Sequence, residues 1–186
     1  MGSVIAQAMM SVDGYIAKDD NTIGRLFDWL QNGDVELVSP RGDMTLHLTS
    51  QSAEHMRSWI ATFGVLVCGR TLFDVTDGWD GRHDFDVPVV VVTHRVPAEW
   101  VEAHPTAPFV FVTDGVEAAI ADAQQIAGNL AVDVTAGVIA GECLEHGCST
   151  RWRATWSRSS WAAGGASPGT PPSRTCRPTH RTVWGT

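Results

Sequence analysis

The sequence changes character at Gly147, and this change limits what the chain can fold into. Residues 1–146 contain all 21 acidic residues but only 7 of the 13 basic ones, which gives them a formal charge of −14. Residues 147–186 contain the other six basic residues, all arginine, and four of the eight tryptophans. They contain no leucine, isoleucine, methionine or phenylalanine, and so lack the aliphatic faces that build a core. We therefore predict a folded domain over residues 1–146 and a disordered tail over residues 147–186.

The composition of the tail is typical of GC-rich coding DNA read out of frame. When residues 147–157 are written with GC-rich codons and the bases are regrouped, one permitted product contains the aliphatic and acidic residues of a strand-forming segment. We interpret the tail as the product of a frameshift. The alternative is a real basic tail, whose arginine and tryptophan side chains would suit a single-stranded nucleic acid or a protein partner.

The bulk properties of the chain exclude several classes of partner. The acidic charge of residues 1–146 argues against nucleic acid, although a phosphorylated small molecule needs only one local arginine and a few backbone N–H groups. No stretch approaches the roughly 18 apolar residues of a membrane span, and no signal peptide is evident at the amino terminus. No cysteine and histidine spacing matches a common zinc site, so we predict no metal. We expect a cytoplasmic protein with a small-molecule substrate.

Apolar runs alternate with helical patterns along residues 1–146. The runs rich in valine and isoleucine lie at residues 3–10, 64–69, 87–93, 108–113 and 130–135. Helical spacing marks residues 52–63, 116–127 and 137–146, whereas residues 18–50 resemble a long polar substrate loop. Continuous β-branched runs indicate strands that are covered on both faces. The pattern predicts an α/β fold with a doubly wound, mostly parallel sheet and helices on both faces.

Glycine and polar residues follow these predicted strands. They form the segments Gly69-Arg70-Thr71, Thr93-His94, Thr113-Asp114-Gly115 and Ala136-Gly137. Glycine lets the backbone approach a phosphate closely, and the start of the next helix offers unpaired N–H groups. Arg70 adds a fork of donors that suits a phosphate monoester. The set suggests NADPH, while ordinary turn chemistry would explain the glycines equally well.

Four segments carry a resemblance to a known family. They read Ser-Val-Asp-Gly-Tyr-Ile-Ala at residues 11–17, Gly-Arg-Thr-Leu-Phe-Asp at 69–74, Thr-Asp-Gly-Val-Glu-Ala-Ala at 113–119 and Ala-Gly-Val-Ile-Ala at 136–140. In order and spacing they resemble the dihydrofolate reductase superfamily. The branch they resemble most contains the C-terminal reductase domain of the riboflavin biosynthesis protein RibD. The resemblance covers roughly residues 3–146.

The resemblance implies a dihydrofolate reductase-like fold and hydride transfer from NADPH to a C=N or C=O group of a small heterocycle. Arg70 and Thr71 would hold the adenosine-side phosphate, and Gly137, Val138 and Ile139 would meet the pyrophosphate. Other residues would line the cofactor cleft, namely Ala8, Gly69, Thr93 and Thr113. Asp13 would lie near the nicotinamide and the substrate. Trp29 would contact the substrate, and Asp28 would be a candidate proton donor.

The chain departs from the family pattern in two places. Ala136 replaces the first glycine of a Gly-Gly pair, which would restrict approach of the backbone to the pyrophosphate. The family also has a central strand after the last helix, beside the first strand, and the tail lacks its sequence. We therefore expect this strand to be missing and two sheet edges to be exposed.

Several functions follow from the resemblance and its departures. The leading one is reduction of a phosphoribosylaminouracil of riboflavin biosynthesis, with a homodimer as the expected state of an intact form. The alternatives are a dihydrofolate reductase-type activity, a non-catalytic nucleotide-binding module, and a poorly folded product with little activity.

Overall fold

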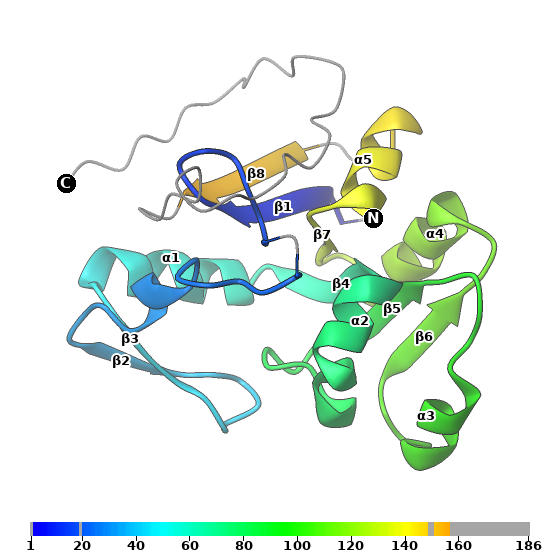
Figure 1. Cartoon of the computed structure of the whole chain (residues 1–186), viewed down its shortest axis with the longest axis horizontal. Helices are drawn as coiled ribbons and strands as arrows, with labels where there is room; N and C mark the ends of the chain where they lie inside the picture. The colour runs from blue at the N-terminus through cyan, green and yellow to red at the C-terminus, as the bar shows by residue number, and fades with distance from the viewer. Residues whose placement is uncertain (1, 19, 149–150, 157–186) are drawn as a thin grey trace.

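Six strands form one parallel sheet in the order β6-β5-β4-β7-β1-β8 (Figure 1). The computed structural model describes residues 2–18, 20–148 and 151–156 of the 186 in the chain. In chain order, the sheet consists of β1 (Val4–Met10), β4 (Phe63–Gly69), β5 (Val89–Val92), β6 (Phe109–Val112), β7 (Ala131–Thr135) and β8 (Arg151–Trp156). The first five of these strands are the apolar runs that the sequence predicts.

Helices cover both faces of the sheet. Alternate residues of β4 point to opposite sides, so that Val65 and Val67 pack in one cluster with α4 (Val116–Ala127) and α5 (Val138–Glu145). Leu66 and Cys68 pack in a second cluster with α2 (Arg70–Val75). A short helix, α3 (Ala98–Ala103), adds Trp100 to the second cluster. The prediction of a parallel α/β sheet with helices on both faces is confirmed.

The segment that the sequence predicts as a polar loop contains regular structure. A short 3-10 helix, η1 (Asp28–Leu30), precedes an antiparallel hairpin of β2 (Val35–Val38) and β3 (Thr45–Leu48). One face of this hairpin packs against Met56 of α1 (Ser50–Ile60). Thr49 caps α1, because its hydroxyl accepts a hydrogen bond from the Ser52 N–H at 3.2 Å. The hairpin and α1 thus form a small second layer beside the main sheet (Figure 1).

The predicted loss of the strand beside β1 is wrong. Residues 151–156, in the part of the chain expected to be disordered, form β8 and pair in parallel with β1 from Ile5 to Met10. The physical reason is that strand pairing uses backbone N–H and C=O groups, which any side chain leaves available. The edge of β1 therefore accepts a strand that lacks aliphatic residues. The remainder of the tail, residues 157–186, lies outside the described residues, as do residues 149–150.

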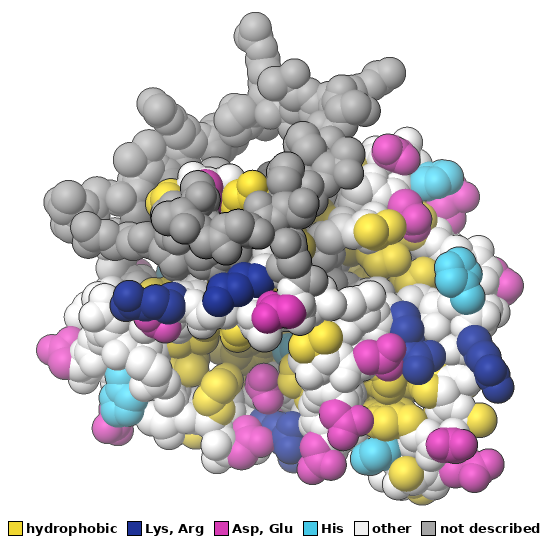
Figure 2. All heavy atoms as spheres, viewed as in Figure 1, with side chains coloured by type: hydrophobic (Ala, Val, Ile, Leu, Met, Phe, Trp, Pro, Cys, Tyr) yellow, Lys and Arg dark blue, Asp and Glu magenta, His cyan; other side chains and the backbone are white. Residues whose placement is uncertain are grey.

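No helix among the described residues is long and apolar enough to cross a membrane. Figure 2 shows acidic side chains scattered over the visible face, with fewer basic ones among them. This distribution agrees with the formal net charge of −8 at pH 7.

Candidate functional site

The carboxyl ends of four strands meet at one edge of the sheet. Gly69 ends β4, and Thr93 directly follows β5. Thr113 directly follows β6, and Gly137 follows β7 by two residues. Because β6, β5, β4 and β7 are successive neighbours in a parallel sheet, these ends share one edge. Ligands of open α/β sheets bind beyond this edge.

Two helices begin at this edge with a glycine in the positive-φ region. Gly115 precedes α4 with φ +93°, and Gly137 precedes α5 with φ +115°. Neither helix start has a side-chain cap. A Cβ on Gly115 would meet no atom within 4 Å, and one on Gly137 would meet only the Ile16 Cδ1 at 4.0 Å. Both glycines therefore leave room for close approach to the backbone at these helix starts, which suits the phosphates of a dinucleotide.

Arg70 begins α2 directly after β4 and is held by two partners. Its Nε donates to Asp74 Oδ1 at 2.7 Å, and its Nη1 donates to the backbone carbonyl of Arg95 at 3.0 Å. The Arg70 side chain is 39% exposed, so its remaining N–H groups face solvent. Thr71, the next residue, is exposed. Asp74 competes with any anion that Arg70 would bind.

Thr93 supports this arrangement from β5. Its side chain is buried, and its hydroxyl donates to the Arg95 carbonyl at 3.0 Å while accepting from the Arg95 N–H at 3.3 Å. The Thr93 hydroxyl thus fixes the turn that presents the Arg95 carbonyl to Arg70. Thr113, by contrast, is exposed.

The other predicted site residues occupy different surroundings. Ala8 is buried in β1, Val138 is 75% exposed in the first turn of α5, and Ile139 beside it is partly buried against the core. Asp13 is half-buried in the tight turn that follows β1, where the Tyr15 N–H donates to the Ser11 hydroxyl at 3.0 Å.

Asp28 and Trp29 lie on η1, which packs against β3. The Asp28 carboxylate is exposed and accepts from Arg25 Nε at 2.7 Å. Trp29 packs on the apolar cluster that includes Leu46, Leu48 and Met56. The structure therefore gathers Gly69, Arg70, Thr93, Thr113 and Gly137 at one edge and anchors Asp28 and Trp29 to the hairpin layer.

Sequence reasoning missed a pair of buried polar side chains on the α1-facing side of the sheet. Asp133 of β7 and Gln7 of β1 are 4% and 8% exposed. Burial raises the pKa of Asp133 to about 7, against the opposing effect of the Arg153 guanidinium on β8. An aspartate inside the run Ala-Val-Asp-Val-Thr is the signal that could have identified it.

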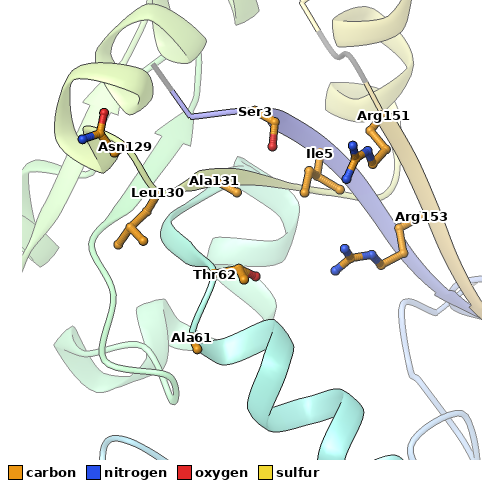
Figure 3. A pocket seen from close by; sticks show the side chains of 9 residues that line it. All are labelled: Ser3, Ile5, Ala61, Thr62, Asn129, Leu130, Ala131, Arg151 and Arg153. Atoms are coloured by element: carbon orange, nitrogen blue, oxygen red, sulfur yellow. The ribbon is translucent and has the colours of Figure 1, made fainter.

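A cavity of about 360 Å³ lies on the same face at the opposite, amino-terminal ends of the strands (Figure 3). Its lining includes Arg151 and Arg153 of β8, Ser3 and Ile5 near the start of β1, and Thr62 before β4. None of the predicted cofactor residues contributes to it. Among the described residues, no group of three histidine, cysteine or acidic side chains is placed to bind a metal.

Comparison with known proteins supports the fold and nothing finer. No protein-family model and no curated protein matches the chain. Among solved structures, it is similar to a putative riboflavin biosynthesis protein from Shewanella sp. PV-4, with a TM-score of 0.55 and 19% sequence identity. The match covers 85% of this chain and 78% of that one. With its parallel six-stranded sheet, the chain has the dihydrofolate reductase-like α/β fold that its sequence motifs predict.

Proposed function

We propose that this protein is an NADPH-dependent reductase that transfers a hydride to a C=N or C=O carbon of a small heterocycle. The observation that carries the proposal is the shared edge of β6, β5, β4 and β7, where two glycine-started helices and Arg70 lie together. The fold is similar to that of a protein named for riboflavin biosynthesis, which favours a phosphoribosylaminouracil as the substrate.

The residues at this edge suit the parts of the cofactor. Arg70 and Thr71 would bind the adenosine-side phosphate, with Arg70 exchanging part of its contact with Asp74 for that phosphate. The first-turn amides of Gly137, Val138 and Ile139 would bind the pyrophosphate. The cleft between them would be lined by Ala8, Gly69, Thr93 and Thr113. The cofactor supplies the hydride, and these residues position its ring against the substrate.

The substrate side would be formed by the segments after β1. Asp13 would lie near the reacting rings, with its position fixed by the Ser11–Tyr15 turn. Trp29 would contact the substrate from η1. Asp28 would serve as the proton donor only after release from Arg25, because that ion pair now occupies its carboxylate.

The proposal is tested by binding and turnover measured on the same preparation. NADPH is titrated against the full chain by calorimetry, and NADPH oxidation is then followed with a phosphoribosylaminouracil and, separately, with dihydrofolate. NADPH binding followed by NADPH oxidation with the aminouracil supports the proposal. NADPH oxidation with dihydrofolate alone would mean that the protein has a dihydrofolate reductase-type activity. NADPH binding without oxidation in the presence of either substrate would mean that the protein is a nucleotide-binding module, and absence of NADPH binding overturns the proposal.

A further inference from the structure

The last turn of α5 ends in a defined backbone motif. Gly147 follows the helix with φ +68°, the left-handed conformation that glycine adopts most easily. Its N–H donates to the Leu144 carbonyl at 3.2 Å, and the Cys148 N–H donates to the Cys143 carbonyl at 2.8 Å. These two hydrogen bonds, in this order, constitute a Schellman motif.

This motif brings together the side chains of Cys143 and Cys148. In a Schellman motif the residue after the glycine characteristically contacts the residue five positions before it. Here Cys143 is fully buried in the main core cluster, and Cys148 is partly buried against that same cluster. The Cys148 thiol lies near enough to contribute to the raised pKa of the Cys143 thiol, and both are free cysteines. Two thiols are thus held adjacent by backbone geometry.

We propose that Cys143 and Cys148 form a reversible disulfide that crosslinks the last turn of α5 to the residue after its terminal glycine. Cys148 lies three residues before Arg151, the first residue of β8. Oxidation would therefore fix the position of Cys148 relative to α5. This site is independent of the proposed cofactor edge, because α5 meets that edge through its other end, at Gly137.

Glutathione disulfide is a suitable oxidant, and the reaction balances in two exchanges. The Cys148 thiolate attacks one sulfur of glutathione disulfide, whose S–S bond breaks to release one glutathione thiolate. The Cys143 thiolate then attacks the Cys148 sulfur, which forms the protein disulfide and releases the second glutathione. The two protons lost from the protein thiols are taken up by the two glutathione thiolates. Cys148 attacks first because Cys143 is inaccessible to a molecule of this size.

The second exchange should be the slower one at neutral pH. In the reduced protein, burial and to a lesser extent the Cys148 thiol raise the pKa of the Cys143 thiol to about 12, and the effect of burial persists in the mixed disulfide. Since the thiolate is the attacking species, we expect the rate of disulfide closure from the mixed disulfide to rise about tenfold per pH unit between pH 7 and 9.

The test uses the full chain with Cys176→Ser, because Cys176 lies outside the described residues and could offer a competing partner. The protein is equilibrated in glutathione buffers of increasing oxidising strength, quenched with acid, alkylated and mapped by mass spectrometry. We expect Cys143 and Cys148 to lose their free thiols together and to appear in one crosslinked peptide. Cys68, buried in the sheet, serves as an internal control that stays reduced.

Two further variants test the order in which the two cysteines react. Cys148→Ser, at the more accessible position, should leave Cys143 reduced in every buffer. Cys143→Ser should stop at a glutathione adduct on Cys148. The proposal is overturned if both thiols survive the most oxidising buffer, if Cys148 of the parent protein stops at the glutathione adduct, or if Cys143 oxidises without Cys148.

Discussion

Asp133 on β7 and Gln7 on β1 project from the same face of the sheet, and each has a buried side-chain oxygen that accepts no hydrogen bond from the described residues. The register pairs Asp133 with Ile5 and Gln7 with Thr135, so the two side chains are diagonal neighbours on adjacent strands. Two adjacent acceptors without a donor are unfavourable in a protein interior. A protonated Asp133 reduces this cost, because a neutral carboxyl is less costly to bury than a carboxylate.

The first prediction concerns the stability that depends on this carboxyl. Burial raises the folded-state pKa of Asp133 to about 7 from its ordinary value of 3.8. Its contribution to stability is therefore fully present below pH 3.8 and is lost as pH rises through about 7. Asp133→Asn cannot ionise, so its advantage over the parent protein should grow between pH 4 and 8, by up to roughly 4 kcal/mol. Urea denaturation at several pH values measures this difference.

The control is Asp114→Asn, since Asp114 is exposed. This variant should follow the pH profile of the parent protein. A difference between Asp133→Asn and the parent that stays constant from pH 4 to 8 would show that the carboxyl titrates in the folded state as it does in the unfolded chain.

The second prediction concerns His83, whose effect on stability has the opposite pH dependence. Burial, and to a lesser extent the Arg41 guanidinium, lowers the pKa of His83 to about 4 from 6.5. The ring packs against Trp79 and Phe85, and its Nδ1 accepts from the Phe85 N–H at 3.2 Å. The neutral ring contributes stability above pH 6.5 that is lost as pH falls through about 4, by about 3 kcal/mol.

His83→Gln should remove this acid-dependent loss even though it lowers stability at neutral pH. Thermal unfolding of both proteins between pH 4 and 7.5 separates the pH dependence of stability from the constant cost of the substitution. Parallel stability curves for the two proteins would assign the acid sensitivity to other groups.

The sequence predicts those features of the fold that depend on local pattern. Val89–Val92 is a strand because a short run of β-branched valines favours a sheet covered on both faces, and α4 follows from its apolar spacing. The hairpin escaped prediction because Val35 and Leu37 alternate over only four residues and become apolar partners of Leu46 and Leu48 only when paired. Its stability depends on α1, which no local pattern reveals.

Tertiary contacts also explain why the sequence predicts only part of the candidate site. Strand order places Gly69, Thr93 and Gly137 at one edge, and the carboxyl-end rule anticipates this from sequence. The partners of Arg70 and the anchoring of Trp29 depend on tertiary contacts. The composition of Arg151–Trp156 wrongly predicts the loss of a strand. The scarcity of aliphatic residues reduces core packing, but the backbone groups still pair with β1. The frameshift origin of the tail stays a prediction, tested by resequencing the coding DNA around codons 140–160.

The third prediction separates cofactor contact from backbone strain at Gly137. Gly137→Ala places a Cβ at φ +115°, where an L-residue is strained, at the start of α5. Gly128→Ala imposes comparable strain at φ +60°, at the carboxyl end of α4, where a Cβ meets no atom within 4 Å. Each variant should lose about 1 kcal/mol of stability. Only Gly137→Ala should weaken NADPH binding by calorimetry, and equal weakening in both would remove Gly137 from the site.

The fourth prediction concerns discrimination between NADPH and NADH. Arg70→Gln should weaken NADPH binding by ten- to a hundredfold, the range expected for a charge-assisted hydrogen bond, and leave NADH binding unchanged. Asp74→Asn should strengthen NADPH binding, because it removes the carboxylate that now holds Arg70 Nε at 2.7 Å. Arg25→Gln, which breaks an exposed ion pair on η1, is the matched control. Equal losses for the two nucleotides would place the adenosine-side phosphate elsewhere.

The fifth prediction tests β8 by comparing chains that end at residue 148 and at residue 156. The longer chain keeps the residues that pair β8 with β1 and serves as the reference. The shorter chain exposes the edge of β1 and should lose roughly 3 kcal/mol, with concentration-dependent aggregation. It also lacks Arg153, whose guanidinium opposes the effect of burial on Asp133. Because this truncation changes burial as well as charge, Arg153→Gln in the chain that ends at residue 156 isolates the charge. The pKa of Asp133 should rise further in this variant, which carboxyl-selective NMR titration would detect, and an unchanged pKa would mean that the Arg153 guanidinium does not influence this carboxyl.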